Sequence, residues 1–258
     1  MKAIEKELKK IENAENRMRI RNKKDTRPAW KSKLEERVPE KVIDGLQKAF
    51  SKAFYLIFEK GVGVIEKTYD KETLEKEFLI RDYAIELMGG SKEIRRLKKD
   101  AAGKRAAVTL GSAVEGIGLG ALGIGMPDIV IWLGVLLRSI YETALEHGYD
   151  YESAEEKFFI LKMMEASMQC GDIWVSVNED VDAYLSRNAH AVPTDQELEE
   201  QIEKTAAAFA TDMLVMKFIQ GIPVVGMIGG AANPVYYQKV MKYVQLKYRK
   251  RYLLSKNH

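Results

Sequence analysis

The stretch PEKVIDGLQKAFSKAFYLIF, residues 39–58, decides the fold class of this 258-residue chain. Its apolar residues recur every three to four positions, a spacing that places them on one face of an α-helix. Pro39 suits the first turn of this helix, and Gly61 and Gly63 mark its expected end. The same spacing returns in most other segments, and alternating β-branched runs of useful length are absent. The sequence therefore predicts an all-α fold.

Two further helix starts carry clear signals. Ser153 with Glu156, and Thr194 with Glu197, fit the capping box, in which side chains and backbone amides exchange hydrogen bonds at a helix N-terminus. Between these starts, residues 171–193 are polar and mixed, and they predict a short helix flanked by loops.

No low-complexity linker divides the chain into halves. We therefore expect a single helical domain of about seven or eight helices over residues 35–254. A basic helical arm, residues 1–34, would precede this domain, and a short tail, residues 255–258, would follow it.

Composition excludes several classes of protein. Hydrophobic residues make up 46% of the chain and charged residues 31%, an ordinary globular balance that excludes wholesale disorder. The single cysteine, Cys170, excludes a disulfide framework and a cysteine-based zinc site. The first residues mix acids and bases without an apolar run, so we do not expect them to be a secretory signal. We therefore expect a protein of the reducing cytoplasm.

Charge is segregated along the chain, although its net value is only +3. Residues 17–33 and 239–258 each carry a net charge of +7, and residues 92–105 carry +5. Residues 142–200, in contrast, carry −12. If the basic segments share one face, they form an anion-seeking surface; the alternative is that they are solvated helix faces that pair with the acidic stretch. The candidate lipid contacts on such a surface are Arg17, Arg19, Arg21, Lys247, Arg249, Lys250 and Arg251.

Two apolar, glycine-rich segments each predict a helical hairpin. Residues 106–137 contain Glu115 and Asp128 as their only charges, and residues 218–238 contain no charge. Prolines interrupt both segments, and Asp128 lies near the middle of the first, so two clean transmembrane helices are not expected. The sequence leaves open whether the hairpins form core or insert into a membrane surface. Small residues four apart allow close helix contact; these are Gly116 with Gly120 and Gly226 with Gly230.

Other motifs do not lead to a cofactor, a metal or a nucleic acid. Residues 118–123 spell GxGxxG, but the preceding residues predict a helix and not the strand that dinucleotide binding requires. His147 lies among Glu142, Glu146 and Asp150, and a surface helix end explains this group better than a metal site. Tyrosines interleave the basic C-terminal tail, but no nucleic-acid-binding module is recognisable.

Asp128 is the acid with the strongest claim to a function. It follows Pro127 and precedes the apolar run of residues 129–137. Burial without a partner would raise the pKa of its carboxyl group, as happens at many functional sites. The alternative is an N-cap, which a carboxylate serves well. Asn233 before Pro234 fits an N-cap still more clearly.

These segments resemble the EcsC protein family. The glycine-rich stretch 116–128 leads into a helix that ends at residues 147–150, and IPVVG at residues 222–226 precedes Gly229-Gly230. His147 departs from the aromatic residue that the resemblance leads us to expect. The likeness covers about residues 35–254, and it implies a bacterial all-α protein, sometimes encoded beside an ABC transporter, with no established activity. The positions that match the family motif are Gly116, Gly120, Pro127, Asp128, Gly148, Asp150, Pro223, Gly226 and Asn233.

We expect a non-enzymatic accessory protein, peripheral on the inner face of the cell membrane. Its basic segments would contact anionic lipid, its hairpins would supply an insertion surface, and an ABC transporter is the partner that the resemblance implies. One alternative is a small hydrolase that uses Asp128 in an apolar pocket, with Glu115 as a second carboxylate. The other is a soluble helical scaffold whose hairpins form the core.

Overall fold

The computed structural model describes residues 2–25, 33, 36–88, 127–185, 192–219 and 234–256. The regular structure of these residues is entirely helical, and none of them forms a strand. The predicted all-α class is therefore confirmed. Most of both glycine-rich segments lies outside the described residues, and so do the hairpins predicted from them.

The α-helices are α1 (Lys2–Lys23), α3 (Glu40–Leu56), α4 (Val62–Glu66), α5 (Lys71–Met88), α8 (Pro127–Glu146), α9 (Ala154–Met168), α10 (Gly171–Leu185), α11 (Asp195–Ile219) and α12 (Pro234–Ser255). A π-helical turn, Ile57–Gly61, joins α3 to α4 without a break. When this continuous rod is counted once, the described residues hold eight helices, in agreement with the expected seven or eight.

The rod that begins at Glu40 corrects one predicted boundary. We expected it to end near Gly61 and Gly63, but it continues to Glu66. Gly61 is the last residue of the π turn and packs closely on the buried Ile57. A Cβ atom at this position would lie only 3.2 Å from Cγ2 of Ile57. Glycine there lets the turn close against Ile57, so the residue supports the helix and does not end it.

The two predicted capping boxes differ in how completely they form. At the start of α11, the Glu197 amide donates to Thr194 Oγ1 at 3.2 Å, and the Thr194 amide donates to Glu197 Oε2 at 2.8 Å. At the start of α9, only half of the box forms: the Glu156 amide donates to Ser153 Oγ at 3.2 Å. The Glu156 carboxylate instead bonds to α12, so a tertiary contact has replaced the local one.

α10 is longer than the short helix expected between loops. It covers fifteen residues, Gly171–Leu185. Trp174, Val181 and Leu185 lie on one side of it and are buried. Their contact with the core stabilises this helix.

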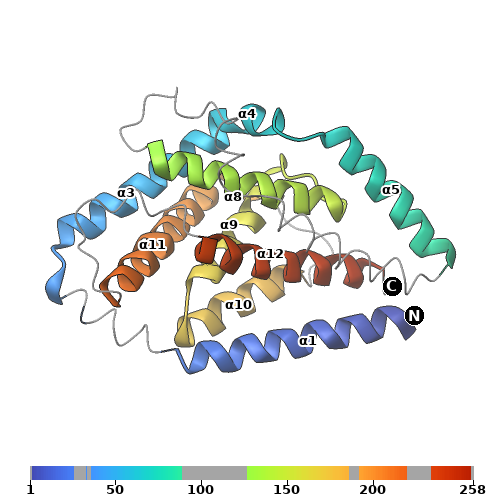
Figure 1. Ribbon diagram of the computed structural model, residues 1–258, viewed down its shortest axis with the longest axis horizontal. Coiled ribbons are helices and arrows are strands. Elements are labelled where there is room, and N and C mark those ends of the chain that lie inside the picture. The colour runs from blue at the N-terminus through green and yellow to red at the C-terminus, as the bar shows by residue number, and fades with distance from the viewer. Residues whose placement is uncertain are drawn as a thin grey trace.

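The core lies where α3, α8, α9 and α11 come together (Figure 1). Phe209 of α11 is central to it, with ring centroids 5.6 Å from both Phe50 and Trp132 and 6.0 Å from Phe54. α9 packs between α10, α11 and α12, and α8 contacts α3, α5 and α12. α5 lies at the periphery of this arrangement (Figure 1).

α1 runs along one edge of the molecule, against α10 and α12 (Figure 1). A small apolar cluster, separate from the main core, fastens its first half. Ile11 of α1 is buried there with Ile85 of α5 and with Tyr252 and Leu253 of α12. The described helix of the predicted basic arm, α1, is therefore packed on the body of the protein, with one side inward and one side outward.

Candidate functional site

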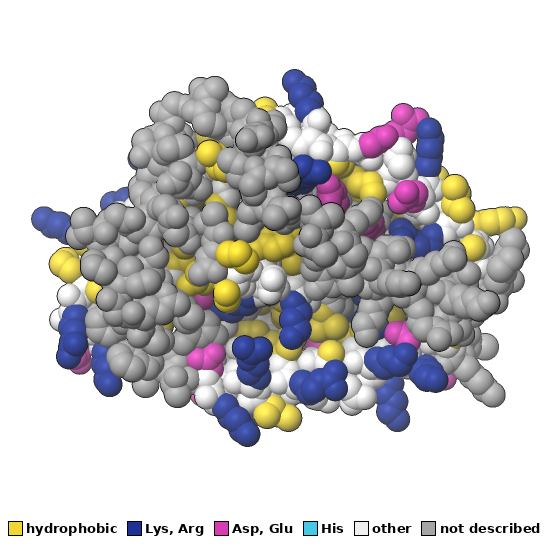
Figure 2. Space-filling view, in the orientation of Figure 1, with side chains coloured by type: hydrophobic (Ala, Val, Ile, Leu, Met, Phe, Trp, Pro, Cys, Tyr) yellow, Lys and Arg dark blue, Asp and Glu magenta, His cyan; other side chains and the backbone are white. Residues whose placement is uncertain are grey.

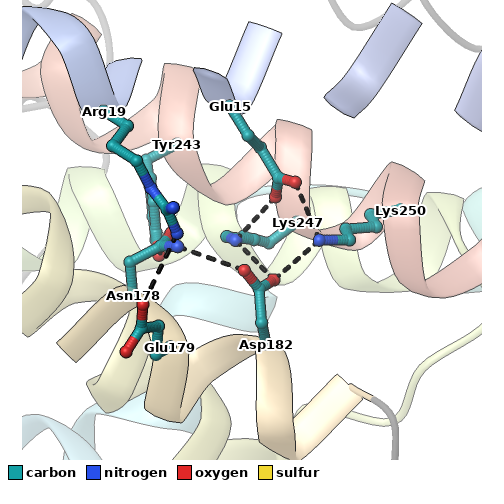
Figure 3. Close-up of polar contacts among 8 residues, drawn as sticks. All are labelled: Glu15, Arg19, Asn178, Glu179, Asp182, Tyr243, Lys247 and Lys250. Carbon is teal, nitrogen blue, oxygen red and sulfur yellow. Dashed lines mark hydrogen bonds and ion pairs between the residues drawn. The ribbon is translucent and has the colours of Figure 1, made fainter. Parts of the chain in front are cut away.

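A four-charge network joins α1, α10 and α12 (Figure 3). The side chain of Lys247 on α12 has no exposed surface, and its Nζ lies 2.7 Å from Glu15 Oε1 and 2.7 Å from Asp182 Oδ1. Lys250, one turn along α12, reaches the same two carboxylates at 2.8 Å each. Two carboxylates from different helices therefore neutralise two ammonium groups, and the network as a whole carries no net charge.

Neutral hydrogen-bonding groups complete this network. The Tyr243 hydroxyl donates to Asn178 Oδ1 at 2.8 Å, and Asn178 Nδ2 donates to Asp182 Oδ2 at 3.1 Å (Figure 3). Burial opposes ionisation of Asp182, yet the charges and hydrogen bonds of Lys247 and Lys250 together lower the pKa of its carboxyl group. Burial raises the pKa of Tyr243 well above its ordinary value, and Asp182 and Glu15 add to that rise. Tyr243 thus stays protonated and can donate this hydrogen bond.

Two arginines of α12 also pair with acids from neighbouring helices. Arg249 lies 2.8 Å from Glu7 of α1, and Arg251 lies 2.6 Å from Glu156 of α9. The guanidinium carbon of Arg251 also lies 3.9 Å from the centroid of the Tyr149 ring. The Tyr248 hydroxyl donates to the other oxygen of Glu156 at 2.6 Å, so this carboxylate is bonded on both sides.

These contacts change the assignment of four candidate lipid contacts. Lys247, Arg249, Lys250 and Arg251 point into the protein and bind Glu7, Glu15, Glu156 and Asp182. Their side chains are between 0% and 21% exposed. The basic end of α12 therefore does not offer these charges to a lipid surface, and the alternative in which it pairs with acidic segments describes it better.

The spacing of the apolar residues around Lys247 indicates from the sequence that this lysine is buried. Val240, Tyr243 and Val244 are buried, and Lys247 follows them at three- and four-residue intervals on the same side of α12. A lysine in such a stripe must be paired, because an unpaired buried charge is costly. The net charge of residues 239–258 does not distinguish the buried Lys247 from exposed cations of the same segment.

α1 presents an outward stripe of six cations that contains no acid. At about 100° per residue, these positions fall on the side of α1 away from α10 and α12, and all six side chains are exposed. Figure 2 shows Lys and Arg side chains gathered along the edge where α1 lies. The stripe consists of Lys6, Lys9, Lys10, Arg17 and Arg21 of α1 and of Lys24, which directly follows its last residue.

The outward stripe contains two of the three residues of α1 that the sequence suggested as lipid contacts. Arg17 and Arg21 belong to it, whereas Arg19 points toward α10 and lies 3.5 Å from Glu179 (Figure 3). Ile20, 57% exposed, is an apolar residue within the stripe. The window of residues 17–33 missed the first three lysines of the stripe, because Glu5, Glu7, Glu12 and Glu15 balance the lysines of this segment in a count along the sequence.

The candidate hydrolytic residues fall at or beyond the edge of the described structure. Pro127 and Asp128 form the first turn of α8, but their side chains are not among those described. Glu115 and five of the family-motif positions lie outside the described residues; these five are Gly116, Gly120, Pro223, Gly226 and Asn233.

The other two motif positions build the turn after α8. Gly148 has a φ of 80°, and a Cβ atom there would lie 2.3 Å from the Phe78 ring, so only glycine fits. Asp150 accepts a 3.0 Å hydrogen bond from the Glu152 amide through its side chain. Both residues act in the turn itself, which carries the chain into α9.

His147 corrects the expectation of a surface helix end. Its side chain is buried, and Nδ1 lies 2.8 Å from the Thr143 carbonyl oxygen. Burial lowers the pKa of the imidazole to about 4, although the bond to Thr143 opposes this shift. The charges of Arg81 and Arg249 lower the pKa further. The ring is therefore neutral at physiological pH.

Two kinds of site are absent from the part of the chain that the structure describes. Within it, no group of three or more His, Cys, Asp or Glu side chains could hold a metal ion. Among its helices, none combines the length and the apolar character that crossing a membrane requires.

The described residues define an all-α protein with a docked N-terminal helix, which directs Glu7, Glu15 and its apolar residues inward and a basic stripe outward. The chain belongs to the EcsC protein family, because the family's sequence pattern matches residues 2–253. This match takes in α1, whereas the likeness seen in the sequence began near residue 35. Comparison with curated proteins and with solved structures gave no match.

Proposed function

We propose that the protein is a non-enzymatic accessory protein that binds an anionic membrane surface reversibly through the outward stripe of α1. The observation that carries this proposal is the sorting of charge on one helix. Glu7 and Glu15 face inward and are neutralised by α12, while the outward stripe contains six cations and no acid. A surface of this kind attracts phosphate-bearing lipid head groups.

Magnitudes favour peripheral binding over insertion. A lysine or arginine near an anionic leaflet contributes about 1 kcal/mol. The six cations of the outward stripe therefore supply at most about 6 kcal/mol, less where Lys10 is partly neutralised by Glu7. Ile20 adds one exposed apolar side chain next to these charges. Binding of this strength is reversible and weakens with salt, because the Debye length falls to about 8 Å at physiological ionic strength.

The pairing inside the protein supports this proposal in a second way. If α1 were not docked, the carboxylates of Glu7 and Glu15 would be free to repel an anionic surface. The cations of α12 remove that repulsion by binding both acids. The α12 cations would thus favour lipid binding by the outward stripe, although they do not face the lipid themselves. An ABC transporter of the same membrane is the partner that the family resemblance implies.

Co-flotation with vesicles tests the proposal. The purified protein is mixed with phosphatidylcholine vesicles that contain or lack phosphatidylglycerol, at low and at high salt. We expect flotation only with the anionic vesicles, and we expect it to fall as salt rises. The test variant carries Lys6→Gln, Arg17→Gln and Arg21→Gln.

A matched control separates the outward stripe from total charge. The variant Lys41→Gln, Lys48→Gln and Lys52→Gln removes the same three charges from exposed positions of α3. We expect the α1 variant to float poorly and the α3 variant to float like the unmodified protein. Equal loss in both variants, or equal flotation with neutral vesicles, would overturn the assignment to α1.

A further inference from the structure

α5 carries the densest group of exposed apolar side chains in the described residues. Leu79, Ile80 and Tyr83 are 64%, 72% and 63% exposed. The other large exposed apolar residues are spread over different parts of the described chain: Ile20, Ile173, Val192 and Val235. Figure 2 shows exposed hydrophobic side chains at the edge of the molecule where α5 lies. Scattered apolar residues are normal on a surface, whereas a cluster marks an interaction site.

The cluster lies within a longer face, which we call the α5 stripe. At about 100° per residue, its members fall within a sector of about 120°. The opposite side of α5 packs inward through Leu74, Phe78 and Ile85. The α5 stripe consists of Glu72, Lys76, Leu79, Ile80, Tyr83 and Glu86.

The order of residues along the α5 stripe is self-complementary. Lys76 and Glu86 lie at equal distances along the chain from residue 81, and so do Leu79 and Tyr83. If two copies of α5 pack antiparallel about a two-fold axis near this point, Lys76 of one copy meets Glu86 of the other. The same operation places Leu79 against Tyr83 of the second copy and brings the two Ile80 side chains together near the axis. An isologous interface requires this self-matching pattern.

We propose that the α5 stripe is a homodimer interface in which α5 helices from two copies pack antiparallel. The charges at its two ends are accessible, since the side chains of Lys76 and Glu86 are 66% and 58% exposed. Each also has a partner within its own chain, Glu72 for Lys76 and Lys256 for Glu86. In the dimer, Lys76 would therefore lie between Glu72 of its own chain and Glu86 of the second copy. Glu86 would likewise lie between Lys256 of its own chain and Lys76 of the second copy.

Charge decides between a second copy and a membrane as the occupant of this face. Glu72 and Glu86 belong to the stripe, and an anionic lipid surface would repel both. A second copy instead supplies Lys76 opposite Glu86 twice. One helix face is small beside the roughly 800 Å² that each partner buries in a standard stable interface. We therefore expect weak association that depends on concentration and is independent of the lipid-binding role of α1.

Sedimentation equilibrium from about 5 μM to about 500 μM, a range suited to weak dimers, tests this interface. The unmodified protein should pass from monomer to dimer within the range. Ile80→Asp should raise the dissociation constant at least about tenfold, because it places two carboxylates at the centre of the interface. The matched control is Ile173→Asp, an exposed isoleucine on α10 that should leave the dimer unchanged. Circular dichroism checks that each variant keeps its helical content.

A charge exchange tests the antiparallel register. Lys76→Glu should weaken the dimer, because the introduced carboxylate would face Glu86 of the second copy at both ends of the interface. Adding Glu86→Lys should restore the dimer, since the pair is then reversed and not removed. A monomer at every concentration, an equal effect of Ile80→Asp and Ile173→Asp, or no recovery in the double variant would overturn the proposal.

Discussion

α1 and the end of α12 are both rich in lysine and arginine, but they direct their charges oppositely. On α12, Lys247 and Lys250 point into the protein and share Glu15 and Asp182. On α1, the cations of the outward stripe point to solvent, and the acids of the same helix that bind α12 point inward. The difference teaches that the neighbouring helices, and not the number of charges, decide whether a basic segment can bind an external anion.

The largest effect should follow from removing a buried cation. Lys247→Ala leaves two inward-facing carboxylates with one ammonium group between them, and breaking a buried ion pair costs about 3–5 kcal/mol. Lys6→Ala removes an exposed lysine of the outward stripe and should change the free energy of unfolding by less than about 0.5 kcal/mol. Urea denaturation of both variants measures these changes. Similar losses in the two would erase the contrast between α12 and α1.

Acid should destabilise the protein through His147, which packs against the buried side of α12. Its ring centroid lies 6.0 Å from that of Tyr248 and 6.2 Å from that of Tyr252. The unfolded chain takes up a proton near pH 6.5, but burial lowers the pKa of the folded imidazole to about 4. The stability that depends on the neutral ring is therefore complete above pH 6.5 and is lost as the pH falls toward 4.

The change over this window is about 2–3 kcal/mol, from about 1.4 kcal/mol per pH unit. His147→Gln removes the titrating group, so its stability should depend less on pH than that of the unmodified protein. Denaturation at pH 7 and at pH 4.5 measures both slopes. Parallel slopes would show that this imidazole is not protected from protons in the folded state.

A smaller effect should separate the two sides of α1 itself. Glu15→Gln weakens hydrogen bonds to two ammonium groups and should cost about 1–3 kcal/mol, as for other bonds to charged groups. Glu12→Gln changes an exposed acid of the same helix and should stay within about 0.5 kcal/mol. Thermal melts of the pair provide the comparison. Equal destabilisation would mean that the inward side of α1 is not specially bound.

Local signals predicted much of the fold. The spacing after Pro39, the capping box at Thr194 and the glycine at position 148 all foretold helix starts or ends that the structure shows. Local signals gave wrong predictions where contacts with other parts of the fold determine a helix end or a side-chain partner. Gly61 did not end a helix, because a π turn closes on Ile57. The Glu156 side chain did not complete the predicted capping box, because it binds Arg251 instead.

The candidate site was predictable only in part, for a physical reason. Local charge selected Arg17 and Arg21 as candidate lipid contacts; both side chains are exposed, and the contact itself stays a prediction. Lys247 was misassigned, because its partners Glu15 and Asp182 lie far away in the sequence and meet it only after folding. The rule that a lysine on an apolar stripe needs partners would have indicated its burial without identifying Glu15 or Asp182.

The most direct test of the contrast between α1 and α12 is the rate of lysine acetylation, measured residue by residue with mass spectrometry, with and without anionic vesicles. In the free protein we predict fast modification of Lys6, Lys9 and Lys24 and slow modification of Lys247. With vesicles the first three should become protected, while exposed lysines of α3 such as Lys48 should keep their rate. Fast modification of Lys247 in the free protein, or equal protection of Lys48 and Lys6, would contradict the assignment of lipid binding to the outward stripe.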